Sequence, residues 1–360
     1  MIFAPPAMTT MHACASVSGG AICPPPAIHK PVLLDKVLKA FTPHDGGVYV
    51  DGTFGAGGYS AAILEAADCT VWGIDRDPYA ITTGTAMKDK FGDRLELITG
   101  CFGDMGSLLA KHGVTRVEGV TFDLGVSSMQ LDQPERGFSF RFNGPLDMRM
   151  EGNDAAGPSA ADIVNNMDEK ELADIIYHYG SERRSLHVAR AIVKARSESP
   201  IIHTFQLAGI VRSVVRKSRD GIDPATRTFQ ALRIHVNNEI GELDRGLAAA
   251  ERILSPGGTL AVVSFHSLED RRVKGFLKQR SGATPRPSRH LPDTAVFSPA
   301  PSFTNLSRGA VPPDKAETDV NPRARSGRMR TAIRTNEPAW EINPEQRSTG
   351  CFPTRENEKE

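Results

Sequence analysis

Residues 48–60 read VYVDGTFGAGGYS, a short apolar run followed by an acid and a loop dense in glycine. An apolar helical pattern begins directly after the loop, over 60–67. This order predicts a strand, a tight turn and a helix N-terminus, with which α/β proteins hold a nucleotide-like ligand at the carboxyl edge of a parallel sheet. Glycines in such a turn accept positive φ and let a ligand approach the backbone.

The spacing of the loop indicates which nucleotide-like ligand it suits. Neither the G-x-G-x-x-G spacing of dinucleotide sites nor the Gly-Lys-Ser/Thr ending of a phosphate loop is present. Asp51, just before the glycines, would repel a pyrophosphate but suits an ammonium group. A second strand over 70–74 leads to Asp75, near where doubly wound folds place the carboxylate that accepts the ribose hydroxyls. A ribose and an amine without a phosphate favour S-adenosylmethionine over NAD.

The composition narrows the class of protein. The 360 residues contain 43 lysines and arginines and 43 aspartates and glutamates, so no overall charge attracts the chain to a polyanion. The five cysteines show no metal-binding spacing, which predicts no metal site and free thiols in a reducing compartment. No apolar run approaches the length of a membrane span, and residues 1–28 contain no lysine or arginine. We therefore expect a cytoplasmic protein without a membrane contact, in which residues 1–28 form a disordered extension.

Basic residues are concentrated in two segments. Residues 181–234 contain 11 lysines and arginines against 4 acids, and residues 271–330 contain 13 against 4. Such an excess is typical of a surface that binds a polyanion, and also of arginines that coat solvated helices. The charge pattern alone leaves both interpretations open.

Strands and helices alternate in the first part of the chain. A helix over 32–41 comes first. Strands are then predicted over 48–50, 70–74, 95–99 and 119–122, with helices over 60–67, 78–91 and 105–112 between them. This alternation predicts an α/β fold with a doubly wound, mostly parallel sheet.

The alternation then stops. After a polar loop over 124–150, only helical patterns follow, over 160–166, 168–179, 185–196 and 205–216. A long helix over 226–254, a strand over 259–265, a helix over 268–280 and an antiparallel edge strand over 328–334 return to the sheet. We therefore predict a sheet domain in two parts, 29–140 and 225–335, a helical insertion for the substrate over 141–224, a Pro/Ser-rich segment of low order over 281–322 and a disordered tail over 336–360.

Several further motifs follow one another along the chain. They are HKPVLL at 29–34, GIDRDP at 73–78, FDLGVSSMQLD at 122–132, ERGFSF at 135–140, GPLDMRM at 144–150, PATRTFQ at 224–230, SFHSLEDR at 264–271 and NPRARS at 321–326. With these motifs and the glycine loop, the chain resembles the bacterial small-subunit ribosomal RNA cytosine-N4 methyltransferases of the MraW/RsmH type. The resemblance covers about residues 29–334.

The resemblance implies a class I S-adenosylmethionine-dependent methyltransferase fold with a helical insertion. It implies methyl transfer to the exocyclic N4 of one cytidine in the decoding region of 16S rRNA, within the small ribosomal subunit or its late precursor. A homodimer is an open alternative to a monomer. The implied cofactor contacts are Gly57, Gly58, Tyr59, Asp75, Phe102, Asp123 and Gln130. The family often has histidine where this chain has Tyr59, so the role carried over there is that of the backbone.

The chemistry of the implied reaction places demands on the site. The lone pair of the cytosine N4 amine is delocalised into the ring, so an enzyme must position the amine in line with the methyl group and accept one of its hydrogen bonds. Asp123, at the end of the fourth strand, suits either that role or a contact with the cofactor, which the resemblance favours. The catalytic residue is therefore open, with Asp123 and Asp147 as candidates.

Other residues carry alternative interpretations. Phe102 suits an apolar face on adenine or core packing. Arg149 and the nearby Phe138, Phe140 and Phe142 suit stacking on an unpaired base or an ordinary anchored loop. His266 suits a base or a ribose contact, although a histidine at a strand end is more often structural. Phosphate contacts are predicted for basic residues that also suit solvated surface, namely Arg227, Arg323 and Arg325.

Three other functions compete with this hypothesis. A nucleotide-dependent oxidoreductase would need the missing glycine spacing. A non-catalytic cofactor- or RNA-binding protein would bind the cofactor but transfer no methyl group. A DNA amino-methyltransferase would share the cofactor and the charge pattern, and would differ in its polymer.

Overall fold

The computed structural model describes residues 31–152, 155–217, 221–283, 299–305, 307 and 309–341. The extension predicted over 1–28 lies outside these ranges. The tail predicted as disordered over 336–360 is described only to residue 341. In that part Trp340 lies over the Arg280 guanidinium, 4.5 Å from its carbon to the ring centroid, and donates its indole N–H to the Ala300 carbonyl.

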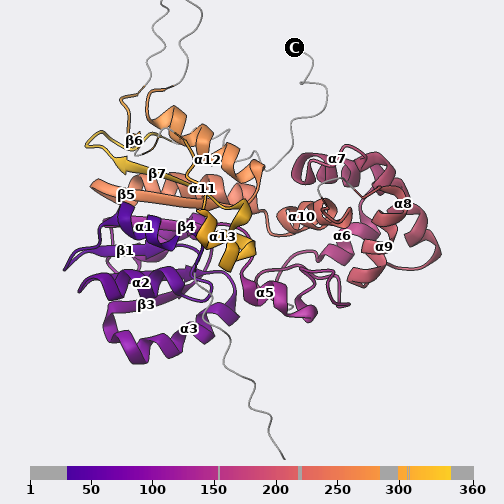
Figure 1. Cartoon of the computed structure of the whole chain (residues 1–360), viewed down its shortest axis with the longest axis horizontal. Coiled ribbons are helices and arrows are strands. Elements are labelled where there is room, and N and C mark those ends of the chain that lie inside the picture. The colour runs from indigo at the N-terminus through magenta and orange to yellow at the C-terminus, as the bar shows by residue number, and fades with distance from the viewer. Residues whose placement is uncertain are drawn as a thin grey trace, which may run out of the picture.

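Seven strands form one sheet in the order β3-β2-β1-β4-β5-β7-β6 (Figure 1). Five pair in parallel, β1 Val48–Asp51, β2 Thr70–Asp75, β3 Leu95–Thr99, β4 Val117–Asp123 and β5 Leu254–Ser264. Strand β7 (Arg328–Arg334) is antiparallel to both of its neighbours, β5 and β6 (Phe303–Asn305). The doubly wound, mostly parallel α/β sheet is confirmed. The expected edge position of 328–334 is wrong, because β6 pairs with its free side.

The sheet separates two hydrophobic cores. One face is covered by α1 Leu34–Phe41, α2 Gly58–Ala66 and α3 Pro78–Phe91, and the other by α4 Met105–Ala110, α11 Glu239–Ile253 and α12 Ser267–Arg280. Successive strand residues point to opposite faces. Val50 and Val120 therefore lie in the second core, while Tyr49 and Val71 lie in the first.

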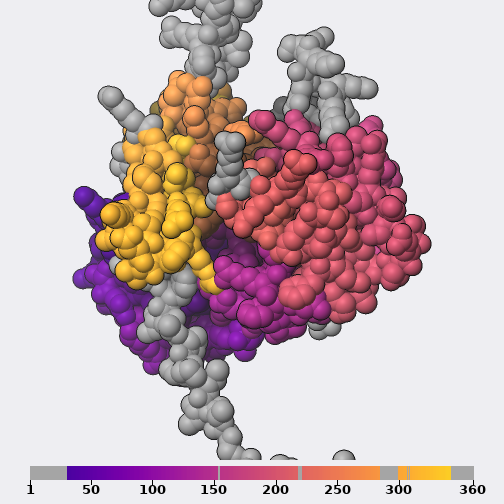
Figure 2. All heavy atoms as spheres, turned by 45° about the vertical axis from the view of Figure 1, so that its right-hand side comes forward, coloured from indigo at the N-terminus to yellow at the C-terminus, as the bar shows by residue number. Residues whose placement is uncertain are grey.

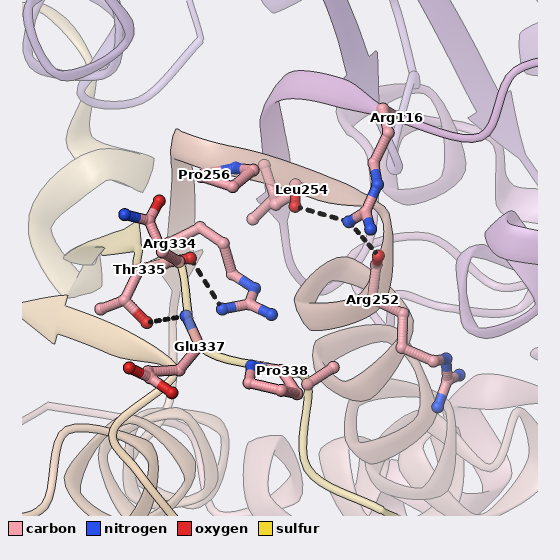
Figure 3. A pocket seen from close by; sticks show the side chains of 10 residues that line it. Arg116, Arg252, Leu254, Pro256, Arg334, Thr335, Glu337 and Pro338 are labelled. Atoms are coloured by element: carbon pink, nitrogen blue, oxygen red, sulfur yellow. Dashed lines mark hydrogen bonds between the residues drawn. The ribbon is translucent and has the colours of Figure 1, made fainter.

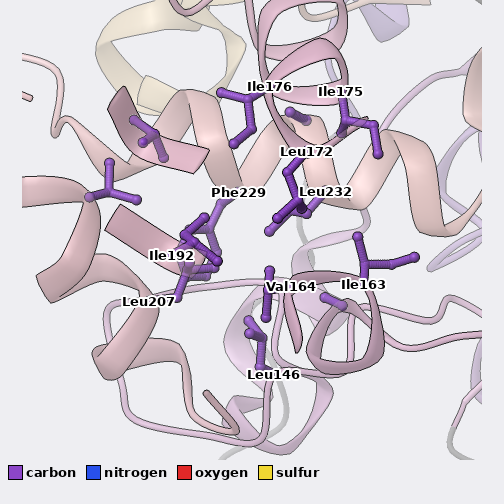
Figure 4. Close-up of a cluster of buried hydrophobic side chains, with 14 of the residues drawn as sticks. Leu146, Ile163, Val164, Leu172, Ile175, Ile176, Ile192, Leu207, Phe229 and Leu232 are labelled. Carbon is purple, nitrogen blue, oxygen red and sulfur yellow. The ribbon is translucent and has the colours of Figure 1, made fainter. Parts of the chain in front are cut away.

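A third core belongs to five helices that stand beside the sheet (Figure 1). These helices, here called the helical unit, are α6 Ala160–Asn166, α7 Glu169–Gly180, α8 Ser185–Glu198, α9 Thr204–Val214 and α10 Ala225–Val236. Figure 4 shows Leu172, Ile176 and Ile192 meeting Leu146 and Phe229 in its interior. Because α10 contributes Phe229 to this core, it packs with the helical unit and not with the sheet.

The single helix predicted over 226–254 is wrong. The structure has α10 and α11 with a break at Asn237 and Asn238, and Leu254 already begins β5. Asn238 has a φ of 47°, a left-handed conformation that asparagine accepts more readily than most residues. The Asn237 side chain donates to the Met148 carbonyl and accepts from the Met150 N–H. These long-range hydrogen bonds stabilise the break between α10 and α11. They cannot be predicted from the helical periodicity of the sequence.

The low order predicted over 281–322 is wrong for the part that the structure describes. Strand β6 is anchored by Phe303, which is almost fully buried, and α13 spans Lys315–Val320. The loop expected over 124–150 also contains a short helix, α5 Ser128–Asp132. Among the described residues, no helix combines the length and the apolar character that crossing a membrane requires.

The left-handed break at Asn238 gives a test of the two-helix arrangement. Asn238→Val should lower the midpoint of thermal unfolding by a few degrees, because a β-branched residue pays roughly 1–2 kcal/mol in this conformation. Asn238→Gly, the matched control, should leave the midpoint nearly unchanged or raise it. Equal midpoints for the valine and glycine variants would mean that the chain continues as one helix through this position.

Candidate functional site

Three acids mark the carboxyl edge of the sheet. Strands β1, β2 and β4, which are neighbours in the sheet, end in Asp51, Asp75 and Asp123. Because parallel strands end at a common edge, the three carboxylates lie side by side where doubly wound folds bind their ligands. The environment of each acid differs, and the difference determines what each can do.

Asp51 is fully buried and braces the glycine loop from inside. Its carboxylate accepts the Ser60 hydroxyl at 2.8 Å and the Thr53 N–H at 3.4 Å. Burial raises the pKa of Asp51 to about 6, against the lowering effect of the Ser60 hydrogen bond and with a further rise from Asp75. The acid that the sequence assigned to an ammonium ligand therefore titrates close to neutral pH.

Asp75 is half-buried and fixes two backbone turns. One carboxylate oxygen accepts the Gly55 N–H at 2.7 Å and the other accepts the Asp77 N–H at 2.8 Å. Burial raises its pKa, although these two hydrogen bonds lower it. A carboxylate oxygen accepts more than one hydrogen bond, so both oxygens retain acceptor capacity for a ligand.

The glycines of the loop serve the packing of the protein itself. A Cβ on Gly57 (φ 74°) would lie 2.5 Å from the Met87 sulfur, and one on Gly58 would lie 2.2 Å from Pro31 Cγ. A Cβ on Gly55 (φ 52°) would meet no atom closer than 3.8 Å. The approach of a ligand is therefore not needed to explain Gly57 and Gly58, whereas the space beside Gly55 is open.

The ring of Tyr59 is buried in the protein. Its hydroxyl donates to the Val32 carbonyl, which holds the N-terminal segment against the first turn of α2. Burial raises the pKa of this phenol well above its usual range, and the charges of Asp123 and Asp51 raise it further. A contact of Tyr59 with a ligand in the loop would therefore come from its backbone.

Asp123 contains an orphaned oxygen. Its backbone N–H donates to Thr53 Oγ1 at 2.6 Å, but the buried Oδ1 has no hydrogen-bond partner among the described residues. Burial raises its pKa well above the usual range, and Asp51 and Glu269 raise it further. A buried acceptor without a donor costs free energy, so this oxygen indicates that a donor or cation belongs beside it.

The other two predicted cofactor residues are packed at the same edge. The centroid of the Phe102 ring lies 4.8 Å from that of the Phe122 ring. The Phe102 ring also packs against Gly246, where a Cβ would lie 2.4 Å from Phe102 Cδ2. The Gln130 side chain accepts the Ser127 N–H and donates to Asp77 at 2.9 Å. Phe102 is partly exposed and Gln130 is buried, so their present contacts are with the protein.

The sequence interpretation missed a network around Asp77. It gave Asp77 no role of its own beyond its place before the helix predicted over 78–91, and the Tyr79 N–H does donate to its carboxylate at the start of this helix. Gln130 and Arg136 also donate to Asp77, each at 2.9 Å. The S-x-x-Q spacing of Ser127 and Gln130 is a capping-box signal for this short helix, which the sequence interpretation overlooked.

Asp147 is committed to an ion pair. The Arg149 guanidinium donates to both of its oxygens, with the shortest contact at 2.6 Å, and to the Ala155 carbonyl. No hydrogen bond described for the Asp147 side chain reaches β4. The structure therefore does not join the two candidate catalytic acids, Asp123 and Asp147, by any described contact.

His266 lies in a charge network at the end of β5. It caps α12, and its Nε2 lies 2.9 Å from a carboxylate oxygen of Glu269. Burial raises the pKa of Glu269, but His266 and Arg233 outweigh this effect, so the pKa is lowered. Glu239, His266 and Glu269 lie close enough to hold a cation. However, Arg233 donates to both Glu239 oxygens, at 2.7 and 2.9 Å, which favours a charge network over a metal site.

The predicted RNA-binding residues divide between buried and exposed positions. Phe138 is buried and Phe140 packs edge-on against Phe229, so in this aromatic loop only Phe142, 59% exposed, presents its ring to solvent. Arg323 lies 2.8 Å from Asp132 of α5. Arg227 lies 3.7 Å from Glu182. Figure 2 shows a hollow between the C-terminal residues 309–335 (yellow) and the helical unit (red).

The chain is similar to known proteins over most of its length. The MraW methylase family matches residues 26–335. A protein of Rhodospirillum rubrum is 59% identical over 88% of this chain and 97% of its own length, and one of Rhodospirillum centenum is 62% identical over 87% and 94%. Both relatives are named ribosomal RNA small subunit methyltransferase H. The chain belongs to the MraW methylase family.

Proposed function

We propose that this protein uses S-adenosylmethionine to methylate the exocyclic N4 of a cytidine in the decoding region of 16S rRNA, in the cytoplasm. The observation that carries the proposal is the orphaned Asp123 oxygen in a row of three carboxylates at the carboxyl edge of the sheet. The names of the relatives support the rRNA substrate. Membership in a methylase family removes the oxidoreductase alternative.

The residues at the carboxyl edge suit this cofactor. S-adenosylmethionine supplies an electrophilic methyl group and carries a sulfonium and an ammonium charge. The half-buried Asp75 would accept the ribose hydroxyls, and the backbone of Gly57, Gly58 and Tyr59 would line the methionine end. Phe102 would contact the adenine face, while Gln130 would hold Asp77 and the loop after β4 in place.

Asp123 suits a contact either with the cytosine amine or with the cofactor, and we assign it to the cofactor. Its buried, unpartnered oxygen would be stabilised by a positive charge or a donor of the cofactor. Asp147, held by Arg149, is then a positioning residue of the substrate loop and not the proton acceptor.

We assign the helical unit and residues 309–335 to the RNA. Exposed arginines lie in the turn before α8, at Arg183 and Arg184, and in the C-terminal segment, at Arg325. We propose that the RNA enters the hollow between these parts, which Figure 2 shows. A target base must leave its stack to reach the methyl group, and the exposed Phe142 ring suits a neighbouring unpaired base.

The direct test is methyl transfer from labelled S-adenosylmethionine to small ribosomal subunits that lack the modification, followed by nucleoside identification. The proposal expects label in N4-methylcytidine from 16S rRNA and none in duplex DNA. Cofactor binding without transfer to any ribosomal substrate would favour the non-catalytic alternative. Label in DNA would favour the DNA amino-methyltransferase.

The role of Asp75 gives a quantitative prediction. Asp75→Asn keeps the size of the side chain but removes its charge, so it should weaken S-adenosylmethionine binding by about 1.5–3 kcal/mol for each charged hydrogen bond that it removes. Titration calorimetry measures this change in affinity. The matched control, Asp93→Asn, changes an exposed acid of the same domain and should bind normally.

A second ligand separates ribose binding from loop support, because Asp75 also holds Gly55. A 2′-deoxy analogue of S-adenosylhomocysteine should bind the wild type more weakly than the parent compound, but should bind Asp75→Asn about equally well. If the 2′-deoxy analogue loses the same affinity relative to the parent compound in both proteins, Asp75 does not bind the ribose.

The RNA surface gives a further prediction. Replacing Arg183, Arg184, Arg323 and Arg325 together by glutamine should weaken binding of small-subunit RNA and leave cofactor affinity unchanged. The slope of log K against log salt should fall by about 0.7–0.9 for each phosphate that the protein no longer neutralises. Filter binding over a salt series measures the slope.

The control removes the same number of charges from another part of the sheet domain, at Lys88, Lys90, Arg94 and Lys111. This variant should keep the wild-type slope. An unchanged slope in the first variant, or an equal fall in both, would show that the chosen arginines do not mark the RNA surface.

A further inference from the structure

A cavity of about 310 Å³ lies at the opposite edge of the sheet from the row of carboxylates. Strands β4 and β5 begin there and the antiparallel β7 ends there. The walls include three arginines and apolar side chains, namely Arg116, Arg252, Arg334, Leu254, Pro256 and Pro338 (Figure 3). Its size is at the lower end of ligand cavities, which suits a small ligand or one group of a larger one.

Backbone carbonyls hold two of the three arginines of this cavity, Arg116 and Arg334. Arg116 donates to the carbonyls of Arg252 and Leu254, at 3.0 and 3.3 Å. Arg334 donates to the carbonyls of Glu251 and Ser302, at 2.8 and 3.0 Å, and to its neighbour Thr335. Among the described residues, none of the three arginines of the cavity forms an ion pair with a carboxylate. The carbonyls fix the guanidinium groups without neutralising them.

Among the described residues, no acid near the cavity forms an ion pair with its arginines, although Glu251 partly offsets the charge of Arg334. The Glu251 carboxylate lies 3.1 Å from Arg280 and also accepts the Ser302 hydroxyl and the Trp340 N–H. Glu337 lines the cavity, but Figure 3 shows its carboxylate turned away from the Arg116 guanidinium. The cavity therefore has an excess of positive charge, because Glu251 is paired with Arg280 and Glu337 does not face Arg116.

The charge of Arg334 is unfavourable in this setting. Only 5% of the residue is exposed, and burial lowers the pKa of its guanidinium. Glu251 raises that pKa, and the like charge of Arg116 lowers it, so the two guanidinium groups repel each other. Glu251, whose carboxylate is already paired with Arg280, offsets only part of the cost of burying this charge, and a bound anion would offset more of it.

We propose that this cavity binds a phosphate group, supplied either by a free phosphate compound or by a phosphodiester of RNA. The carbonyl hydrogen bonds of Arg116 use only its Nη1, so its Nε and Nη2 remain for the two-pronged contact that suits a phosphate. Arg334, whose Nε and Nη1 are used, can add a donor from Nη2. The site lies at the edge of the sheet opposite the proposed methyl-transfer site and does not depend on it. Failure of one proposal would leave the other standing.

The first experiment titrates the full chain with inorganic phosphate and with a 5′-mononucleotide, in a buffer without phosphate at constant ionic strength. Calorimetry or ³¹P line broadening reports the affinity. Arg116→Gln, which changes an exposed residue, should lower the affinity about tenfold or more, because it removes charged hydrogen bonds. The phosphate affinity of Arg116→Lys should lie between those of the wild type and Arg116→Gln, because lysine keeps the charge but lacks the planar guanidinium group.

Arg94→Gln is the matched control. Arg94 also donates to two backbone carbonyls, those of Leu64 and Ala67, but lies outside the cavity. It should leave phosphate affinity unchanged. An equal loss of affinity in the Arg94 and Arg116 variants, or no loss in the Arg116 variant, would overturn the proposal, because binding would then not depend on the cavity. Absence of phosphate and nucleotide binding together with an unchanged RNA slope would overturn it as well.

The two sources of phosphate are separated by an RNA titration of the same variants. If RNA supplies the group, Arg116→Gln should lower the slope of log K against log salt for small-subunit RNA by about 0.7–0.9. If a free compound supplies it, the RNA slope should stay at its wild-type value while the mononucleotide affinity falls. Both results support a phosphate site.

Discussion

The confinement of three carboxylates to one edge of the sheet is the constraint on which the rest of the site depends. Asp51, Asp75 and Asp123 end neighbouring strands, and burial together with mutual repulsion disfavours their ionised forms. The hydrogen bonds of the fold offset this cost to a different extent for each of the three acids. Asp51 receives a hydroxyl and an N–H, Asp75 receives two N–H groups, and one oxygen of Asp123 receives nothing. The Asp123 oxygen that lacks a donor is the physical reason to expect a cationic ligand.

The same edge connects the sheet with the helical unit. Arg76, directly after β2, donates to the Asn237 carbonyl at 2.8 Å and to Glu151. Asn237 in turn holds Met148 and Met150 through hydrogen bonds of its side chain. The break between α10 and α11 is therefore part of the site, because it ties the proposed RNA-binding helices to the residue next to Asp75.

Local patterns in the sequence predicted much of the sheet domain. The bounds of α3 and β3, and those of β7, match the predictions because alternation and helical periodicity are strong there. The failures come from long-range contacts. Phe303 makes β6 a strand through the partners that bury it, and Asn237 ends α10 through its bonds to a distant loop.

The sequence predicted which acids form the site, but it did not predict their hydrogen bonds or their packing. The acids that end β1, β2 and β4 were visible in the sequence, but the orphaned oxygen of Asp123 depends on how neighbouring segments pack. The predicted reason for Gly57 was incomplete, because its packing against Met87 already requires glycine. The arginine cavity gave no signal, since Arg116, Arg252 and Arg334 are far apart in the sequence.

The most direct test of the account is the number of protons released when S-adenosylmethionine binds near pH 6. A cation favours the ionised form of a carboxylate, so binding should lower the raised pKa values of Asp51 (about 6) and Asp123 and release protons. Affinity should therefore increase as the pH rises through this range. Calorimetry in buffers of different ionisation enthalpy counts the protons. The account predicts release of the order of one proton per cofactor. Binding without proton exchange, or with uptake, would contradict it.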